Sequence, residues 1–213
     1  KSSADQIKAM RAGEVQIAGI SPGPTVYAVN LAGYVPIAVM CKSDGTFGYQ
    51  LNLITGKNSN IASRGDLGGR KVAHVSRLSN SGQAAEGYEI VYSGSQGNSI
   101  KGVVDGAYAA AAVNSNALAR MESRGAVDPE KLRVVWKSGS FPSTSFGFAH
   151  NLAPDLQRKI HDAFLTFDWK NTALAREFGR QADKFCTISY QETWESIRLI
   201  QKENGVRYDV KDL

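Results

Sequence analysis

The chain has 213 residues, 42% of them hydrophobic, and a formal net charge of +5. This is enough for a sizeable core or two small lobes, and no apolar run approaches the roughly 20 residues of a membrane-spanning helix. The basic residues are scattered and alternate with acidic residues on helical faces, which is typical of solvated surface. We therefore expect no nucleic acid among the partners.

The chain contains two cysteines, Cys41 and Cys186, and neither belongs to a CxxC pair or to a Cys/His cluster with metal-ligand spacing. We therefore expect no metal and no other cofactor. A disulfide between the two could form in an exported chain, but the expectation is two buried free thiols.

The first quarter of the chain alternates between helix and strand patterns. The sequence predicts helices over 3–12 and 24–32, and strands over 15–20, 36–40 and 50–55. Gly13 closes the first helix, and Pro24 is well placed to begin the second.

The rest of the chain continues the alternation. Segment 57–60 is polar and turn-prone, and we interpret it as a crossover between lobes; 138–145 would return the chain to the first lobe. The predicted strands are 72–75, 88–92, 109–113 and 132–136, and the predicted helices are 99–105, 114–124, 154–167, 173–178 and 191–204. Strands alternating with helices favour an α/β fold with largely parallel sheets.

One loop has the residue types of an anion-binding site. Residues 74–82, HVSRLSNSG, form a strand-like run that ends in Ser79, Asn80, Ser81 and Gly82. Short hydroxyl and amide side chains beside free backbone N–H groups can cradle a small oxyanion without a metal or an arginine clamp.

With its segments in order, the sequence resembles the periplasmic phosphonate-binding proteins, the solute receptors of ABC importers, over nearly its whole length. The motifs that carry the resemblance are IKAMRAGEV (7–15), FGY (47–49), DLGGRKV (66–72), SNSG (79–82), YSGS (92–95) and DPEKLRVVWKS (128–138).

The resemblance implies a two-lobed, type II-like periplasmic binding protein fold with two crossovers and the ligand in the interlobe cleft. Lobe one would comprise 1–56 and 146–213, and lobe two 57–145. It also implies a periplasmic location, with the signal peptide not present in this sequence, and a membrane permease of an ABC transporter as partner. We expect a monomer.

The sequence departs from the family pattern in two places. Family members carry a strand–helix–strand unit before the position of Ser3, and a helix after the SNSG loop, where only Gln83–Gly87 intervene here. Either the protein has been shortened or the sequence leaves out segments that the protein contains. We expect the second, because such losses would expose core surface.

The resemblance also implies a set of ligand-binding residues. Ser79, Asn80 and Ser81 match the oxyanion loop, and Tyr49 matches a cleft tyrosine. At three further candidate positions this sequence differs from many relatives or lies beside such a difference. Ser3 stands where many relatives place an aromatic residue that closes over the ligand. Ser95 and Gln96 belong to a Gly-Ser-x motif in which relatives often carry histidine at the third position, here Gln96.

Two neutral positions narrow the expected ligand. Relatives that bind aminoalkylphosphonates place acids near the positions of Asn116 and Thr144, where they pair with the ammonium group. Burying a cation without such a partner costs several kcal/mol. We therefore expect a small phosphorus oxyanion without an amine: phosphite, hypophosphite or methylphosphonate. Phosphate, or another tetrahedral oxyanion, remains the alternative.

Catalysis is disfavoured by the sequence. His74, His150 and His161 are far apart, and none neighbours a nucleophile or an acid pair; nucleophile elbow, P-loop and zinc spacing are missing. We expect no enzyme. A ligand-sensing module for a membrane histidine kinase would use the same fold and the same ligand chemistry, so it stays open.

Overall fold

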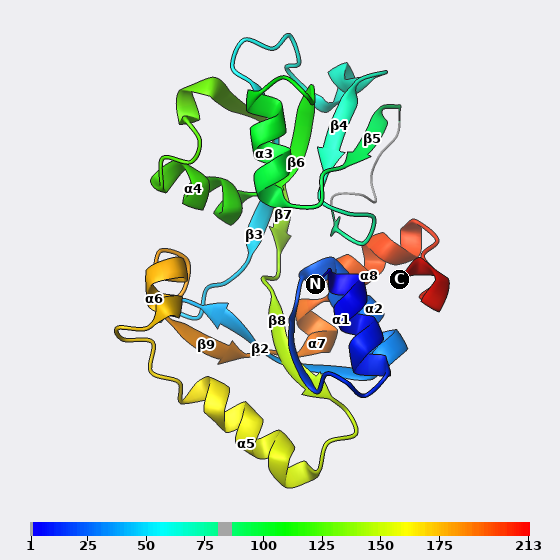
Figure 1. The fold of residues 1–213 in the computed structure, drawn as a ribbon, viewed down its shortest axis with the longest axis vertical. Helices are drawn as coiled ribbons and strands as arrows, with labels where there is room; N and C mark the ends of the chain where they lie inside the picture. Colours follow the sequence, from blue (N-terminus) through cyan, green and yellow to red (C-terminus); the bar gives the residue numbers. More distant parts are fainter. Residues whose placement is uncertain (1, 81–86) are drawn as a thin grey trace. The chain divides into compact units, whose positions relative to one another are not determined.

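The computed structural model describes residues 2–80 and 87–213. The chain divides into two compact units, the first formed by Lys1–Gly48 with Phe141–Leu213 and the second by Tyr49–Ser140. Each unit has its own sheet and its own helices (Figure 1). The chain therefore passes between the units twice, after Gly48 and after Ser140.

Both boundaries of the second unit lie earlier in the sequence than those of the expected second lobe, 57–145. Strand β3 (Tyr49–Gly56), expected in lobe one, pairs antiparallel with β6 (Ala110–Asn114) of the second unit. Segment 57–60, expected as a crossover, lies inside that unit, where the N–H of Lys57 donates to the carbonyl of Lys131 at 2.8 Å. A strand's apolar pattern indicates that it is buried but does not identify its partner, so the sequence could not assign β3 to a lobe.

The first unit is built on a four-stranded sheet in the order β1-β8-β2-β9. Its strands are β1 (Ile17–Ile20), β2 (Tyr34–Cys41), β8 (Ser145–Ala149) and β9 (Lys184–Thr187). Its helices are α1 (Ser3–Arg11), α2 (Pro22–Ala32), α5 (Pro154–Leu165), α6 (Ala173–Phe178), α7 (Tyr190–Thr193) and α8 (Glu195–Glu203), with a short 3-10 turn at Val210–Asp212.

All three pairings of this sheet are antiparallel, so the expectation of largely parallel sheets is wrong for the first unit. The β1–α2–β2 alternation looks like a parallel unit in sequence. However, β8 comes from more than a hundred residues further along the chain and lies between β1 and β2.

The predicted helix over 191–204 is in fact two helices, α7 and α8, which meet at the buried Trp194.

The core of the first unit is aromatic on one side of the sheet. Phe148, Trp169 and Phe185 pack there with Ile37 and Ile160, the last from α5. Elsewhere in the unit, α8 contacts α2: the indole N–H of Trp194 donates to the Pro22 carbonyl at 2.9 Å. These contacts are made entirely within the first unit.

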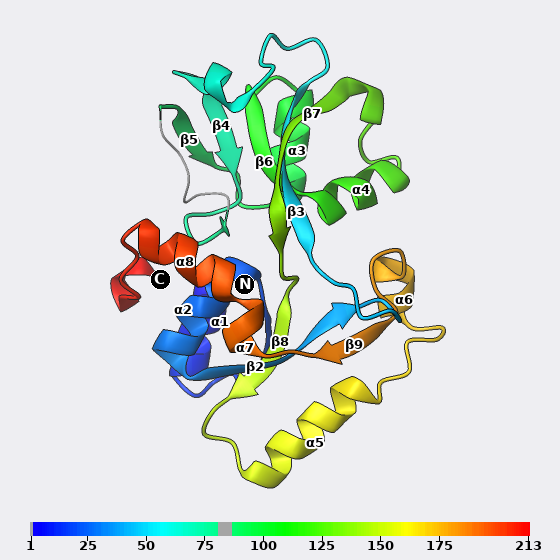
Figure 2. The same cartoon turned by 180° about the vertical axis from the view of Figure 1, so that it is seen from behind.

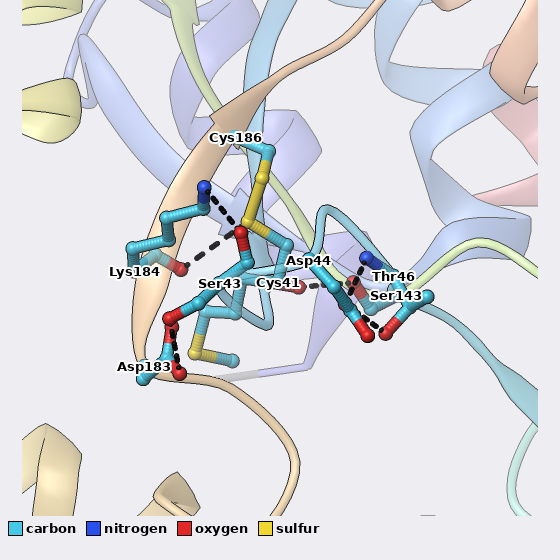
Figure 3. Close-up of a disulfide and its surroundings, with 9 residues drawn as sticks. Cys41, Ser43, Asp44, Thr46, Ser143, Asp183, Lys184 and Cys186 are labelled. Carbon is cyan, nitrogen blue, oxygen red and sulfur yellow. Dashed lines mark hydrogen bonds between the residues drawn. A yellow bond between two sulfur atoms is a disulfide. The ribbon is translucent and has the colours of Figure 1, made fainter.

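Cys41 and Cys186 form a disulfide between β2 and β9, with their Cα atoms 5.9 Å apart (Figure 3). The expectation of two free thiols is therefore wrong. The residues are separated by 145 positions in sequence, and only the pairing of β2 with β9 brings them together. The turn after Cys41 is fastened to β9 as well, since Ser43 Oγ donates to Asp183 at 2.8 Å and Lys184 Nζ to the Ser43 carbonyl at 3.1 Å.

The second unit has a five-stranded sheet in the order β5-β4-β6-β3-β7. Besides β3 and β6 it contains strands β4 (Lys71–His74), β5 (Glu89–Tyr92) and β7 (Leu132–Phe141), helices α3 (Gln96–Val104) and α4 (Ser115–Ser123), and short 3-10 helices at Arg64–Leu67 and Pro129–Lys131. Here β4 runs parallel to both β5 and β6.

Two apolar clusters lie in this unit. Ile100 and Val103 of α3 and Leu118 of α4 pack on Ile54, Ala73, Ala111 and Val113 of the strands, and Figures 1 and 2 show α3 over β6. The second cluster contains Leu53, Val72 and Ala110 with Ile61 and Leu67. Alternate residues of each strand thus enter different clusters, as the period of two requires.

Candidate functional site

Four segments of the second unit meet at one edge of its sheet. Because β4 is parallel to β5 and to β6, all three strands end there. Strand β3 runs the other way, with Leu51 opposite Asn114, so it begins there. The carboxyl edge of parallel strands is where α/β proteins bind ligands. Predicted site residues follow each of the three strands, and Tyr49 stands at the start of β3.

Tyr49 and Asn80 are in direct contact. The side-chain amide of Asn80 donates to the hydroxyl oxygen of Tyr49 at 3.1 Å. Burial raises the pKa of Tyr49 to about 12, and the bond from Asn80 opposes that rise. The phenol is therefore neutral and can donate its own proton. Asn80 Oδ1 is buried and accepts no hydrogen bond within the described residues.

The turn after β4 holds Ser79. The backbone N–H and the hydroxyl of Ser79 both donate to the Ser76 carbonyl, at 3.1 and 2.6 Å. That hydroxyl proton is thus directed into the turn. Ser81, the third predicted residue of this loop, lies outside the described residues.

Helix α3 begins beside the end of β5. Ser95 is its N-cap, and its hydroxyl oxygen accepts the N–H of Asn98 at 3.0 Å. Such a cap satisfies one of the four orphan N–H groups of a helix start. The predicted helix over 99–105 begins three residues too late, because the polar Gln96–Asn98 turn hides the helix start.

Gln96 links the starts of the two helices. Its side-chain oxygen accepts the backbone N–H of Asn114 at 2.9 Å, so the carboxamide NH2 group is the part that can face a ligand. That amide makes no hydrogen bond in the part of the chain that the structure describes. A neutral carboxamide thus stands at this position of the edge.

Helix α4 begins with a second cap at the end of β6. Asn114 Oδ1 accepts the N–H groups of Asn116 and Ala117 at 2.8 and 3.2 Å. Ser115 Oγ accepts the N–H of Gln50, beside Tyr49, at 3.1 Å. Asn114 and Ser115 were not among the predicted site residues. An Asn at the end of an apolar strand and before a helical run is the N-cap signal that could have found Asn114.

The N-terminal ends of two helices give this edge of the sheet a positive electrostatic character. The positive dipole ends of α3 and α4 both lie here, and they favour an anion. The described carboxylates of the second unit occupy other positions. Asp66 and Glu89 stand before or at the start of strands, Asp105 and Glu122 near the ends of helices, and Asp128 and Glu130 before β7. Within the described residues, no acid of this unit stands at the site edge.

Ser3 and Thr144 belong to the first unit. Ser3 is the first residue of α1, whose N-cap is Ser2. Thr144 directly precedes β8 and packs close to Gly19. Both are partly exposed, and their part in ligand binding stays a prediction.

The described residues contain neither a candidate metal cluster nor a candidate membrane span. No group of three or more His, Cys, Asp or Glu residues that could hold a metal occurs in the described ranges. None of the described helices is long and apolar enough to cross a membrane.

The fold is that of a two-lobed periplasmic binding protein. A binding protein component of an ABC phosphonate transporter from Pseudomonas aeruginosa superposes with a TM-score of 0.81 at 21% identity, covering 100% of this chain and 76% of that one. The protein PhnD1 from Prochlorococcus marinus, in complex with methylphosphonate, gives 0.80 at 15% identity over 96% of this chain and 84% of that one.

A sulfonate receptor also shares the fold. The alkanesulfonate-binding protein SsuA from Xanthomonas axonopodis pv. citri, bound to MOPS, gives a TM-score of 0.62 at 14% identity, covering 98% of this chain and 83% of that one. At these identities the likeness concerns the fold alone.

The family is established by sequence. Residues 1–194 match the family model of the ABC transporter phosphonate periplasmic substrate-binding protein. The chain belongs to this family, as its motifs predicted. It is therefore the extracytoplasmic, substrate-binding component of a transport system, with a membrane permease as partner, and the family is one of receptors rather than enzymes.

Proposed function

We propose that this receptor captures a small phosphorus oxyanion that carries no amine: phosphite, hypophosphite or methylphosphonate. The observation that carries the proposal is the neutral donor set at the carboxyl edge of the second sheet. Tyr49, Asn80 and Gln96 supply O–H and N–H groups, and the starts of α3 and α4 supply positive dipole ends.

Neutral donors suit an anion in a site from which water is excluded. Hydrogen bonds to a charged acceptor are about twice as strong as neutral ones, and a low local dielectric strengthens them further. An ammonium group would gain nothing from such donors. It would need a carboxylate, and the acids of the described second unit stand elsewhere.

The two neutral positions of the sequence analysis support the same choice. Asn116 lies in the first turn of α4, beside the cap formed by Asn114. Its carboxamide takes the place of the acid that aminoalkylphosphonate receptors use. Thr144, together with Ser3, stays a proposed contact from the first unit.

Phosphate is the close competitor, since it offers the same oxygens. A site built for P–H or P–CH3 discriminates by placing an apolar wall against that substituent, which leaves a fourth phosphate oxygen unpaired. The buried ring of Tyr49 is the proposed wall, because it presents carbon as well as a hydroxyl.

A thermal-shift panel tests the proposal. Phosphite, hypophosphite, methylphosphonate, phosphate, arsenate and 2-aminoethylphosphonate are compared at equal concentration. A ligand at a hundred times its Kd adds about 2.7 kcal/mol of stability. We expect the largest shift with one of the first three. A largest shift with 2-aminoethylphosphonate would contradict the amine-free assignment, and no shift with any of them would contradict the ligand class.

A further inference from the structure

A pocket lies wholly within the first unit. It has a volume of about 520 Å³ and is lined by α2 and by the end of the chain, including Val26, Asn30, Tyr190, Arg198, Lys202 and Tyr208. Pockets of about 300–1,000 Å³ with aromatic walls and a few convergent polar groups are typical of small-molecule sites.

The aromatic walls of this pocket are held in place. Tyr208 packs edge-to-face on Tyr27, with ring centroids 5.2 Å apart, and its hydroxyl donates to Gln201 at 3.0 Å. The Gln201 amide is itself anchored to the Gly23 carbonyl at 3.1 Å. The pocket is therefore preformed, and a ligand need not order its walls on binding.

Another part of the lining places a cation over an aromatic ring. The guanidinium carbon of Arg198 lies 5.5 Å from the ring centroid of Tyr190. An Arg198 N–H donates to the Gln191 carbonyl, whereas its buried Nε has no partner within the described chain. Burial raises the pKa of Tyr190 to about 12 although Arg198 opposes the rise. The phenol is thus a neutral donor beside a fixed guanidinium.

The pocket carries positive charge without a counter-charge. Arg198 and Lys202 are one turn apart on α8, and Arg207 completes a set of three cations in the lining. No acidic residue occurs in the lining, and none of the three cations forms an ion pair within the described residues.

We propose that this pocket is a second ligand site that binds a small organic anion. A carboxylate or phosphate group would be held by Arg198, Lys202 and Arg207, and an apolar or aromatic body would pack against Tyr190, Tyr208 and Val26. Arginine forks match carboxylate and phosphate geometry, and aromatic faces accept flat apolar groups. All three lining cations lie beyond residues 1–194, the part that matches the family model, and none of the predicted oxyanion-site residues that the structure describes lines this pocket.

Amide chemical-shift titration with benzoate and with phenyl phosphate tests this site, and benzamide serves as the neutral isostere of benzoate. The titrations are run with and without excess methylphosphonate. We expect saturable shifts in 26–30 and 190–208 with at least one anion in both conditions, and none with benzamide. Absence of saturable shifts with both anions, or equal shifts with benzamide, would overturn the proposal.

Two double variants with the same change in net charge test whether the anion binds in this pocket. Lys202→Gln with Arg207→Gln should weaken anion binding at least about tenfold, since each removes a charged hydrogen-bond donor. Arg158→Gln with Lys159→Gln on α5 changes the net charge equally outside the pocket and should leave the affinity unchanged. Equal losses in the two pairs would contradict a defined site. Failure of methylphosphonate to bind would bear only on the proposed function.

Discussion

The side-chain amide of Asn80 donates a 3.1 Å hydrogen bond to the hydroxyl oxygen of Tyr49, across 31 residues of chain. The bond joins the start of β3 to the turn after β4, on opposite sides of β6 in the sheet. In this bond the Tyr49 oxygen acts as the acceptor. Two residues that match the family's site motifs are thus fixed against each other inside one rigid unit.

Removing the Tyr49 hydroxyl should weaken the oxyanion site. Tyr49→Phe leaves the ring in place but deletes one donor and strands the Asn80 amide. We expect methylphosphonate affinity to fall at least about tenfold, because hydrogen bonds to charged groups contribute about 1.5–3 kcal/mol. Calorimetry measures the change. Tyr108→Phe, in the same unit but in a loop after α3, is the matched control, and an equal loss there would contradict a local role for Tyr49.

A carboxylate at position 116 should invert the preference for charge. Asn116→Asp places an acid in the first turn of α4, where the helix dipole stabilises it, so the fold should persist. We expect methylphosphonate to bind at least about tenfold more weakly, since the new charge repels the anion. The affinity for 2-aminoethylphosphonate relative to methylphosphonate should rise.

The control for this change is Asn58→Asp, an exposed position after β3 at the opposite edge of the sheet. It alters the net charge equally. Competition calorimetry with both ligands gives the ratio of affinities. An unchanged ratio in Asn116→Asp would show that position 116 does not face the ligand.

The free energy of unfolding at high pH should depend on the buried Tyr49 hydroxyl. Burial raises the pKa of Tyr49 to about 12, above the value near 10 of an exposed tyrosine. A raised pKa means that the folded state holds the proton more tightly, so this contribution is full below pH 10 and disappears as pH rises through 12. Urea unfolding between pH 8 and 12 should show a steeper loss in the wild type than in Tyr49→Phe. Parallel pH profiles would argue against burial of this hydroxyl.

The disulfide should stabilise the first unit. In the chain-entropy model, closing a loop of this length is worth about 5 kcal/mol, and measured losses on removal run at about 2–5 kcal/mol. Cys41→Ala with Cys186→Ala should lower the unfolding midpoint of the first unit, and a reductant should have no further effect on that variant. Detection of two free thiols in the unreduced wild-type protein would contradict the bond.

Gly147 should be irreplaceable in β8. A Cβ there would clash with the Val35 carbonyl oxygen, where β2 and β8 approach closely beside an irregularity in their register. We expect Gly147→Ala to destabilise the first unit by about 3 kcal/mol or more, since neither strand can yield cheaply. Gly56→Ala, with open space at the Cβ position, should cost less than about 1 kcal/mol. Urea unfolding of both variants gives the comparison.

Local patterns predicted most helices and several strands, because periodicity and caps are written in neighbouring residues. The exceptions depend on distant partners. Strands β8 and β9 were not predicted: each is only four or five residues long, and β8 contains a glycine. Their places in the sheet are fixed only by pairing with β1 and β2. The disulfide was missed for the same reason.

The site residues also divide into those that local motifs predicted and those that depend on distant partners. Tyr49, Asn80 and Gln96 were predicted from motifs, and the structure brings Asn80 onto Tyr49 and Gln96 onto the start of α4.

Asn114 was missed although its N-cap signal is local, since it binds the N–H groups of Asn116 and Ala117 in its own helix. Ser115 was missed because it binds the backbone N–H of Gln50, which is distant in sequence. No motif marks a residue such as Ser115, whose contact depends on the start of β3 and the end of β6 meeting at one edge.

Isothermal calorimetry with methylphosphonate, phosphite, phosphate and 2-aminoethylphosphonate, on the same wild-type protein, tests whether the receptor takes a ligand without an amine. The neutral donor set predicts that methylphosphonate or phosphite binds most tightly and that 2-aminoethylphosphonate binds at least about a hundredfold more weakly, because none of the described residues at this edge offers a carboxylate to its ammonium group. Tight binding of 2-aminoethylphosphonate, with methylphosphonate and phosphite inert, would contradict the account.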